Sequence, residues 1–301
     1  HARIEVHYND ELHAKIMGLI TFRKGSGARP SLSSPFNFAP FYLDEFLQIA
    51  KDGSDARRLI YLDTDVVING DVQDLNTLDL QGNAVGAVED CSQKFEIYID
   101  MAVLQEMGWK KGSIMGKTCV FNRGMFVVDV PVWRKQSITP QIELWMKRYS
   151  ETKKDLYKYG MSQPPWLLAV AGRYRRLDLG WNCRGLGREY LGPKELADLA
   201  RSGFNLQILA KELGISQANG NYMRPFLSMC AGKAQLLHYN GAMKPWKKKK
   251  SSKQGPLCAC PHGAAIPKKE IKMANKIPFV ECARLWSLYL SDEVDDKLEA
   301  A

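Results

Sequence analysis

Residues 59–70 read Leu-Ile-Tyr-Leu-Asp-Thr-Asp-Val-Val-Ile-Asn-Gly, an apolar strand that runs directly into two aspartates, Asp63 and Asp65. Because side chains alternate along a strand, positions two apart point the same way. The two carboxylates can therefore offer oxygen ligands to one hard cation such as Mn²⁺ or Mg²⁺. A second interpretation is a hydrophilic turn that caps the strand through side-chain to backbone hydrogen bonds. On this motif alone, both interpretations stay open.

Strand-like and helix-like segments alternate around this motif. The strand candidates are residues 59–62, 84–88, 125–130 and 234–238, and the helix candidates are residues 36–50, 140–149 and 163–171. Such alternation is typical of an α/β fold with a mainly parallel, twisted sheet flanked by helices. In these folds the site lies beyond the carboxyl ends of the strands. Asp63, Asp65, Asp90 and His238 all stand at such ends, so we expect them to converge on one cleft.

The positive charge of the chain is local. The net charge is +9, and the stretch from Lys247 to Lys276 contains nine lysines and one glutamate, so it carries all but one of these charges. We therefore expect a folded domain over 1–246, a basic loop insert over 247–276, and a segment over 277–301 that packs back on the domain. Nucleic acid is not an expected partner, although the insert alone could bind a polyanion.

No stretch of the sequence has the roughly 18 consecutive apolar residues that a membrane span requires. Membrane attachment is therefore expected only through a segment outside this chain.

The seven cysteines are too few for a disulfide scaffold. Cys91 and Cys119 flank elements that should converge, so they are plausible disulfide partners in an oxidising compartment and ordinary buried residues in a reducing one. Cys258 and Cys260 stand beside His262 and allow a zinc interpretation, but no second ligand pair follows at zinc-finger spacing.

A second motif begins at His238, in the sequence His-Tyr-Asn-Gly-Ala-Met-Lys-Pro-Trp. A single histidine at a strand end is more often structural than a ligand. Here, however, Gly241 lets backbone N–H groups approach an anion, and Lys244 adds a point charge that suits a phosphate. Two carboxylates and an imidazole around a cation, next to such a glycine and lysine, describe a nucleotide diphosphate site. The cation would neutralise the charge that develops on a departing diphosphate.

Four motifs occur in an order and spacing that resembles glycosyltransferase family 8 over residues 36–246. They are Asp63-Thr64-Asp65, Phe121-Asn122-x-Gly124, Trp181-Asn182 and His238-x-x-Gly241-x-x-Lys244-Pro245-Trp246. The likeness is greatest to the animal glycosyltransferase 8 domain-containing group and the plant galacturonosyltransferase-like group. The resemblance implies a GT-A fold whose first strand, which cradles uracil, is expected to precede Ile4 and to be missing from this chain. It also implies a UDP-sugar donor, Mn²⁺ (or Mg²⁺), and retention of anomeric configuration.

The resemblance also assigns roles to single residues. Asp63, Asp65 and His238 correspond to metal ligands, with Asp63 also near the ribose, and Gly241 and Lys244 correspond to diphosphate contacts. The residues implied on the sugar and acceptor side are Asp90, Asn122, Gly124 and Gln163, of which Asp90 and Gln163 are the catalytic candidates.

Gln163 stands near the place where bacterial members carry an Asp-Gln pair that touches the transferred sugar, and Ser162 replaces the aspartate. An amide is a poor nucleophile, so the implied reaction is a front-face displacement steered by the leaving diphosphate.

The leading hypothesis is a hexosyl- or uronosyltransferase that acts on a glycan or glycoprotein acceptor in the lumen of the Golgi, as a type II membrane protein in its full length. The alternative is a catalytically weak or inactive relative that binds a glycan or nucleotide. It is suggested by Ser162 and by Pro40, which stands where relatives have an arginine that reaches toward the diphosphate sugar.

Overall fold

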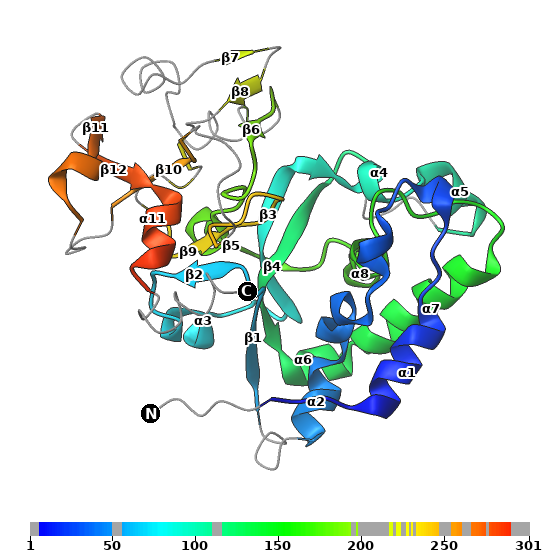
Figure 1. The fold of residues 1–301 in the computed structure, drawn as a ribbon. Helices are drawn as coiled ribbons and strands as arrows, with labels where there is room; N and C mark the ends of the chain where they lie inside the picture. The colour runs from blue at the N-terminus through cyan, green and yellow to red at the C-terminus, as the bar shows by residue number, and fades with distance from the viewer. Residues whose placement is uncertain are drawn as a thin grey trace. The chain divides into compact units, whose positions relative to one another are not determined.

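The computed structural model describes residues 6–49, 56–109, 116–193, 197, 217–218, 221–223, 227–228, 230, 233–246, 254–260, 266–274 and 277–289. The chain divides into two compact units (Figure 1). The first unit contains His1–Tyr61 and Leu75–Arg176, and the second contains Leu62–Asp74 and Leu177–Ala301. Among the described residues, no helix is long and apolar enough to cross a membrane.

The first unit is built on a four-stranded sheet with the order β1-β4-β3-β5. Its strands are β1 (Arg58–Leu62), β4 (Cys119–Asp129), β3 (Val85–Lys94) and β5 (Arg175–Leu177). Val85–Val88 and Met125–Val128 are buried throughout, as is typical of strands covered on both faces. The expected α/β class is confirmed. Strands β3 and β4 pair antiparallel, and at this pair the sheet departs from the mainly parallel arrangement that we expected.

Helices pack with this sheet in the first unit (Figure 1). The α-helices are α1 (Asp10–Leu19), α2 (Leu43–Ile49), α4 (Phe95–Tyr98), α5 (Met101–Glu106), α6 (Val130–Lys135), α7 (Ile138–Glu151) and α8 (Gln163–Val170), and α3 (Gln73–Thr77) spans the boundary between the units. The 3₁₀ turns are η1 (Lys24–Ser26), η2 (Pro30–Ser33), η3 (Pro35–Asn37) and η4 (Ala39–Tyr42).

Helices α7 and α8 confirm the helices expected at 140–149 and 163–171. The single helix expected over 36–50 is wrong, because η3, η4 and α2 occupy this stretch one after another. Pro40 lies in the first turn of η4, where its missing N–H costs nothing, whereas inside a long helix it would remove a hydrogen bond.

Trp166 of α8 is fully buried at the centre of the core of the first unit. Four aromatic rings surround its indole in edge-to-face geometry, a favourable arrangement for aromatic pairs. Their centroids lie 4.5 Å (Phe126), 4.9 Å (Phe121), 5.6 Å (Phe41) and 6.4 Å (Trp133) away. The indole therefore joins the sheet to the helices that pack against it.

A disulfide joins β3 to β4 through Cys91 and Cys119, which confirms the pairing considered from the sequence. The register of the two strands shifts here, with Asp90 opposite Val120 but Lys94 opposite Cys119. Extra residues of β3 therefore bulge out of the ladder directly after Asp90, and the disulfide holds this irregular stretch against the neighbouring strand.

The described residues of the second unit form three small sheets. The strands are β2 (Val66–Ile68) with β9 (Leu236–His238); β6 (Tyr190–Leu191), β8 (Asn221–Met223) and β7 (Gln217–Ala218); and β10 (Leu257–Ala259), β12 (Ile277–Glu281) and β11 (Lys272–Ala274). The described part of this unit also contains the turns η5 (Leu179–Asn182) and η6 (Lys268–Glu270) and the helix α11 (Cys282–Ser287). Val67, Leu237, Tyr239, Val280 and Leu285 share its core.

The zinc interpretation of the Cys-x-Cys pair is wrong for Cys258, because this residue forms a disulfide with Cys282. His262 lies outside the described residues. Of the expected basic insert, 254–260 and 266–274 are described and contain β10, η6 and β11, while the rest, including Lys247–Lys250, lies outside. The expected C-terminal segment is described to residue 289.

We predict that Trp166→Ala destabilises the first unit by about 3–5 kcal/mol, because it leaves a cavity among four aromatic rings. Trp166→Phe should cost much less, since it keeps a ring and removes an indole N–H that has no hydrogen-bond partner among the described residues. Urea unfolding followed by circular dichroism measures both, with Tyr159→Ala at an exposed ring as the control. Equal losses for Trp166→Ala and Tyr159→Ala would contradict the central place of this indole.

Candidate functional site

The pairing of β2 with β9 brings together two distant parts of the sequence. Val66 lies opposite His238 in this antiparallel ladder, and the Tyr239 N–H donates to the Asp65 carbonyl over 2.9 Å. Asp63 and Asp65 lie on the short turn between β1 and β2, and His238 is the last residue of β9. Both carboxylates therefore come beside the imidazole within the second unit.

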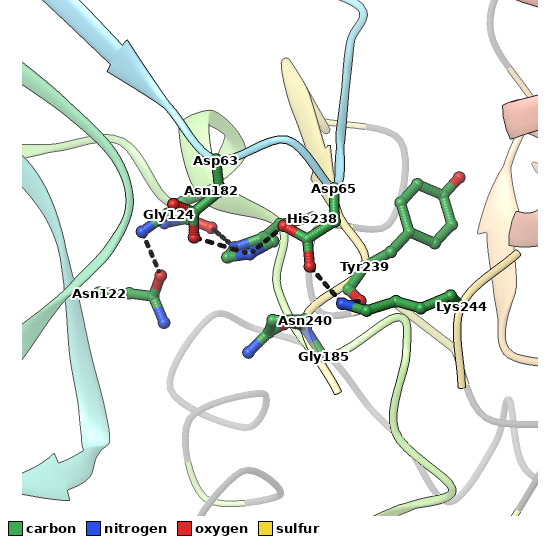
Figure 2. A network of polar contacts seen from close by, with 10 residues as sticks. All are labelled: Asp63, Asp65, Asn122, Gly124, Asn182, Gly185, His238, Tyr239, Asn240 and Lys244. Carbon is green, nitrogen blue, oxygen red and sulfur yellow. Dashed lines mark hydrogen bonds and ion pairs between the residues drawn. The ribbon is translucent and has the colours of Figure 1, made fainter. Parts of the chain in front are cut away.

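Figure 2 shows the imidazole of His238 directed at both carboxylates. Its Nε2 lies 3.3 Å from Asp65 Oδ1 and 3.7 Å from Asp63 Oδ2. One potential ligand atom from each of the three residues lies within 4.8 Å of the others. The side chain of Asp63 is 39% exposed and that of His238 only 3%, so the cluster is open on the Asp63 side.

Asn182, at the end of η5, fixes the other side of the imidazole. It is fully buried, and its Oδ1 lies 2.9 Å from His238 Nδ1. A carbonyl oxygen only accepts hydrogen bonds, so this contact places a proton on Nδ1. Nε2 is buried and has no hydrogen-bond partner among the described residues. Its lone pair can therefore point at a cation, because the partner of one ring nitrogen decides what the other can do.

Asp65 connects this cluster to Lys244. While Asp65 Oδ1 faces His238, Oδ2 forms an ion pair with the Lys244 ammonium, which also donates to the Tyr239 carbonyl over 2.9 Å (Figure 2). Burial alone would raise the pKa of the Asp65 carboxyl, but the neighbouring His238 and Lys244 side chains lower this pKa well below its ordinary value. Asp65 therefore remains ionised at neutral pH, as a metal ligand must.

Two glycines let the loop after β9 pack tightly on a neighbouring loop. Gly241 has a φ of +128°, and a Cβ there would collide with the backbone of Gly187. A Cβ on Gly187 would in turn meet the Tyr239 carbonyl, and the Met243 N–H donates to the Gly187 carbonyl over 2.8 Å. Gly241 therefore shapes the backbone that carries Lys244, and this part of the motif needs glycine for a steric reason.

The donor set fits a divalent cation. Two carboxylates and a neutral imidazole supply hard oxygen ligands and one nitrogen, a set suited to small divalent ions such as Mn²⁺. Nε2, which is buried and makes no hydrogen bond among the described residues, supports this fit, because a buried ring nitrogen is costly to leave unsatisfied. Asp63, Asp65 and His238 are thus the residues that could hold the ion.

The other residues singled out from the sequence belong to the first unit. Asp90 is buried and accepts hydrogen bonds from the backbone and hydroxyl of Ser92. Asn122 Oδ1 accepts from the Gly124 N–H over 2.9 Å, and Gln163 Nε2 donates to the Phe121 carbonyl over 2.9 Å. The structure thus joins Gln163 to the strand that carries Asn122.

Sequence reasoning missed Gly187 and did not assign Asn182 a role at the site. Asn182 was visible as part of the Trp181-Asn182 motif, but its task depends on the Cys183 backbone pairing beside Leu237, which no local pattern reveals. No local pattern marked Gly187. Glycine is required there only because a loop some 50 residues further along the chain packs against its backbone.

The sequence profile of "Glycosyl transferase family 8" matches residues 3–250 of the chain. The chain therefore belongs to glycosyltransferase family 8.

Named relatives support this membership. The chain is 32% identical to "Probable galacturonosyltransferase-like 3" of Arabidopsis thaliana, over 79% of this chain and 58% of the relative. It is 31% identical to "Glycosyltransferase 8 domain-containing protein 1" of Danio rerio, over 70% of this chain and 52% of the relative. The chain thus spans little more than half the length of these relatives.

Among solved structures, the chain is similar to the galactosyltransferase LgtC in complex with donor and acceptor sugar analogs. The identity is 19%, the TM-score is 0.41, and the match covers 72% of this chain and 62% of LgtC.

We predict that Nδ1 of His238 carries a proton both with and without Mg²⁺, because Asn182 accepts from it. Long-range ¹H–¹⁵N correlation spectra can show this, since the chain has only five histidines. Asn182→Leu should remove the preference for Nδ1 and weaken Mg²⁺ binding by about 10- to 100-fold.

The control is Asn69→Leu in the same unit, where the Asn69 side chain accepts a hydrogen bond from Tyr289 instead. A wild-type spectrum with an unprotonated Nδ1 and a proton on Nε2 would contradict the assignment.

Proposed function

We propose that this chain is the catalytic part of a metal-dependent, retaining glycosyltransferase that moves a hexosyl or uronosyl group from a UDP-sugar to a glycan or glycoprotein. Membership in family 8 supports glycosyl transfer. The observation that carries the proposal is the cluster of Asp63, Asp65 and His238, in which a buried Nε2 faces two carboxylates and Asn182 holds the opposite ring nitrogen.

Different residues of this chain would bind the cation and the diphosphate of UDP. Asp63, Asp65 and His238 would hold Mn²⁺ or Mg²⁺, which when bound supplies positive charge against the charge of a leaving diphosphate. Lys244 would add a second positive charge, and the backbone around Gly241 would allow a phosphate to approach closely. Asp65 would orient both parts, because its two oxygens face the imidazole and the ammonium separately.

The remaining candidates are the residues that the family resemblance assigns to the sugar and the acceptor. Asp90 and Gln163 remain the catalytic candidates, with Asn122 and Gly124 beside them along β4 as donor contacts. The hydrogen bond from Gln163 to the Phe121 carbonyl holds its amide in place, which suits orientation of a sugar hydroxyl and not attack on carbon. We infer no protein nucleophile, in keeping with front-face displacement.

The two disulfides support a secretory location. Cys91–Cys119 and Cys258–Cys282 require an oxidising compartment to form and persist. We propose the lumen of the Golgi, with attachment to the membrane through a segment outside this chain.

The decisive test measures UDP release from a panel of UDP-sugars with Mn²⁺, using a full-length form that includes this chain. EDTA should abolish turnover and added Mn²⁺ should restore it. Asp65→Ala should lower kcat/KM by about 10³-fold or more, because it removes a cation ligand and the partner of Lys244. Asp71→Asn, an exposed aspartate of the same unit, is the matched control and should leave turnover unchanged. Turnover that survives in Asp65→Ala would refute the proposal.

A second candidate function is a noncatalytic glycan- or nucleotide-binding relative. Two replacements favour it. Pro40 is buried in η4, and Ser162 is a buried N-cap residue of α8 whose side chain makes no capping hydrogen bond. Metal-dependent UDP binding without turnover of any UDP-sugar would favour this function. The polyanion-binding function expected of 247–276 falls in part on Lys247–Lys250, which lie outside the described residues.

We predict opposite effects of Lys244→Met on the two ligands. UDP affinity should fall by about tenfold or more, because a charge-assisted contact to phosphate is lost. Mn²⁺ binding without UDP should stay the same or tighten, because a positive neighbour of Asp65 disappears. Isothermal titration calorimetry measures both affinities, with exposed Lys233→Met as the control in the same unit. A parallel loss of Mn²⁺ and UDP binding would argue that Lys244 only supports the fold.

A further inference from the structure

The second unit continues beyond residue 250, where the match to the family profile ends. The described part of this extension contains the sheet β10-β12-β11 and the helix α11. The contacts of this extension with the rest of the second unit indicate its role.

The extension is anchored at the start of α11. Leu257 of β10 lies opposite Glu281 of β12, and the disulfide joins Cys258 to Cys282. The Cys282 N–H also donates to the Pro256 carbonyl over 2.8 Å. Cys258 and Cys282 are both buried, so the first turn of α11 is held covalently and by packing.

From this anchor, α11 contacts the motif that begins at His238. The Tyr239 hydroxyl donates to the Cys282 carbonyl over 2.7 Å. The ring of Trp286 lies edge-on to Tyr239, with centroids 5.6 Å apart, and packs on Trp246 with centroids 4.7 Å apart. One helix thus contacts the residue after His238 and the last residue of the motif.

Tyr239 and Trp246 are also the residues that hold Lys244. The Lys244 ammonium donates to the Tyr239 carbonyl and lies 5.7 Å from the centre of the Trp246 ring, within range of a cation–π contact. Trp286 therefore packs against both supports of the lysine that faces Asp65.

We propose that α11 is a positioning element for nucleoside diphosphate binding, in which Trp286 acts through Tyr239 and Trp246 to hold Lys244 ready for the phosphates. A lysine that is held before the ligand arrives loses less conformational freedom on binding. The cation ligands depend on Asn182 and on the β2–β9 pair, so they should depend less on Trp286. This inference rests on the proposed function, because it assigns the diphosphate to Lys244.

The first arm of the test measures hydrogen exchange of the ligand-free protein by mass spectrometry. Tyr239 and Met243 donate backbone hydrogen bonds of 2.9 Å and 2.8 Å, so both report on the loop that carries Lys244. In Trp286→Ala their exchange should accelerate by about tenfold or more, because the loop loses its aromatic support. Unchanged exchange would overturn the proposal.

The second arm measures UDP and Mn²⁺ binding by calorimetry. Trp286→Ala should weaken UDP binding by about tenfold, while Mn²⁺ affinity without UDP changes less than about twofold. Trp286→Phe keeps an aromatic ring and should restore most of the UDP affinity, whereas Trp286→Leu should not. A purely structural role predicts instead that UDP and Mn²⁺ binding fall together.

Met273→Ala, at an exposed position of β11, is the control within the same extension. If the wild type and Trp286→Ala bind UDP equally, the inference fails and the proposed function stands. If the wild type binds no UDP with Mn²⁺, the proposed function fails and the diphosphate role of α11 fails with it. Should Trp286→Ala not fold, Trp286→Leu and Trp286→Phe provide the same comparison.

Discussion

A buried imidazole beside two carboxylates is the constraint on which the second unit depends. Holding two carboxylates close together is costly, so Asp63 and Asp65 need positive charge nearby. Nε2 of His238 can meet this need by sharing a cation with the carboxylates. Asn182 faces Nδ1 on the other side of the ring and keeps Nε2 turned toward them. The site can therefore take up a cation without rearranging its surroundings.

The sequence predicted the parts of this site that are local. The acidic pair follows from strand alternation at 59–65, and the strand ending at His238 follows from its apolar run. Cys91 and Cys119 could be considered as a disulfide pair in advance, because both flank segments that were expected to converge. Helices α7 and α8 were predictable, since their apolar patterns and the prolines in the first turn of α8 are local signals.

What the sequence could not predict depends on contacts between distant segments. The second unit takes Leu62–Asp74 from the middle of the first unit's sequence, so no composition shift marks its boundaries. Side-chain alternation does not specify the direction or the register of strands that are buried on both faces. The antiparallel β3–β4 pair and its bulge after Asp90 depend on both. The requirement for glycine at Gly187 and the Cys258–Cys282 disulfide likewise depend on contacts with residues that are distant in the sequence.

Asp65 links the candidate cation ligands to Lys244 through charge. With a neutral imidazole, Asp63, Asp65 and Lys244 together carry a net charge of about −1, which repels a diphosphate at close range. A bound divalent cation changes this to about +1, which attracts it. The lysine alone cannot reverse the sign, since its ammonium is already paired with Asp65. Under the proposed function, the diphosphate should therefore bind with the cation or after it, and Lys244, held in place by Tyr239 and Trp246, would then meet the phosphates without first leaving the carboxylate.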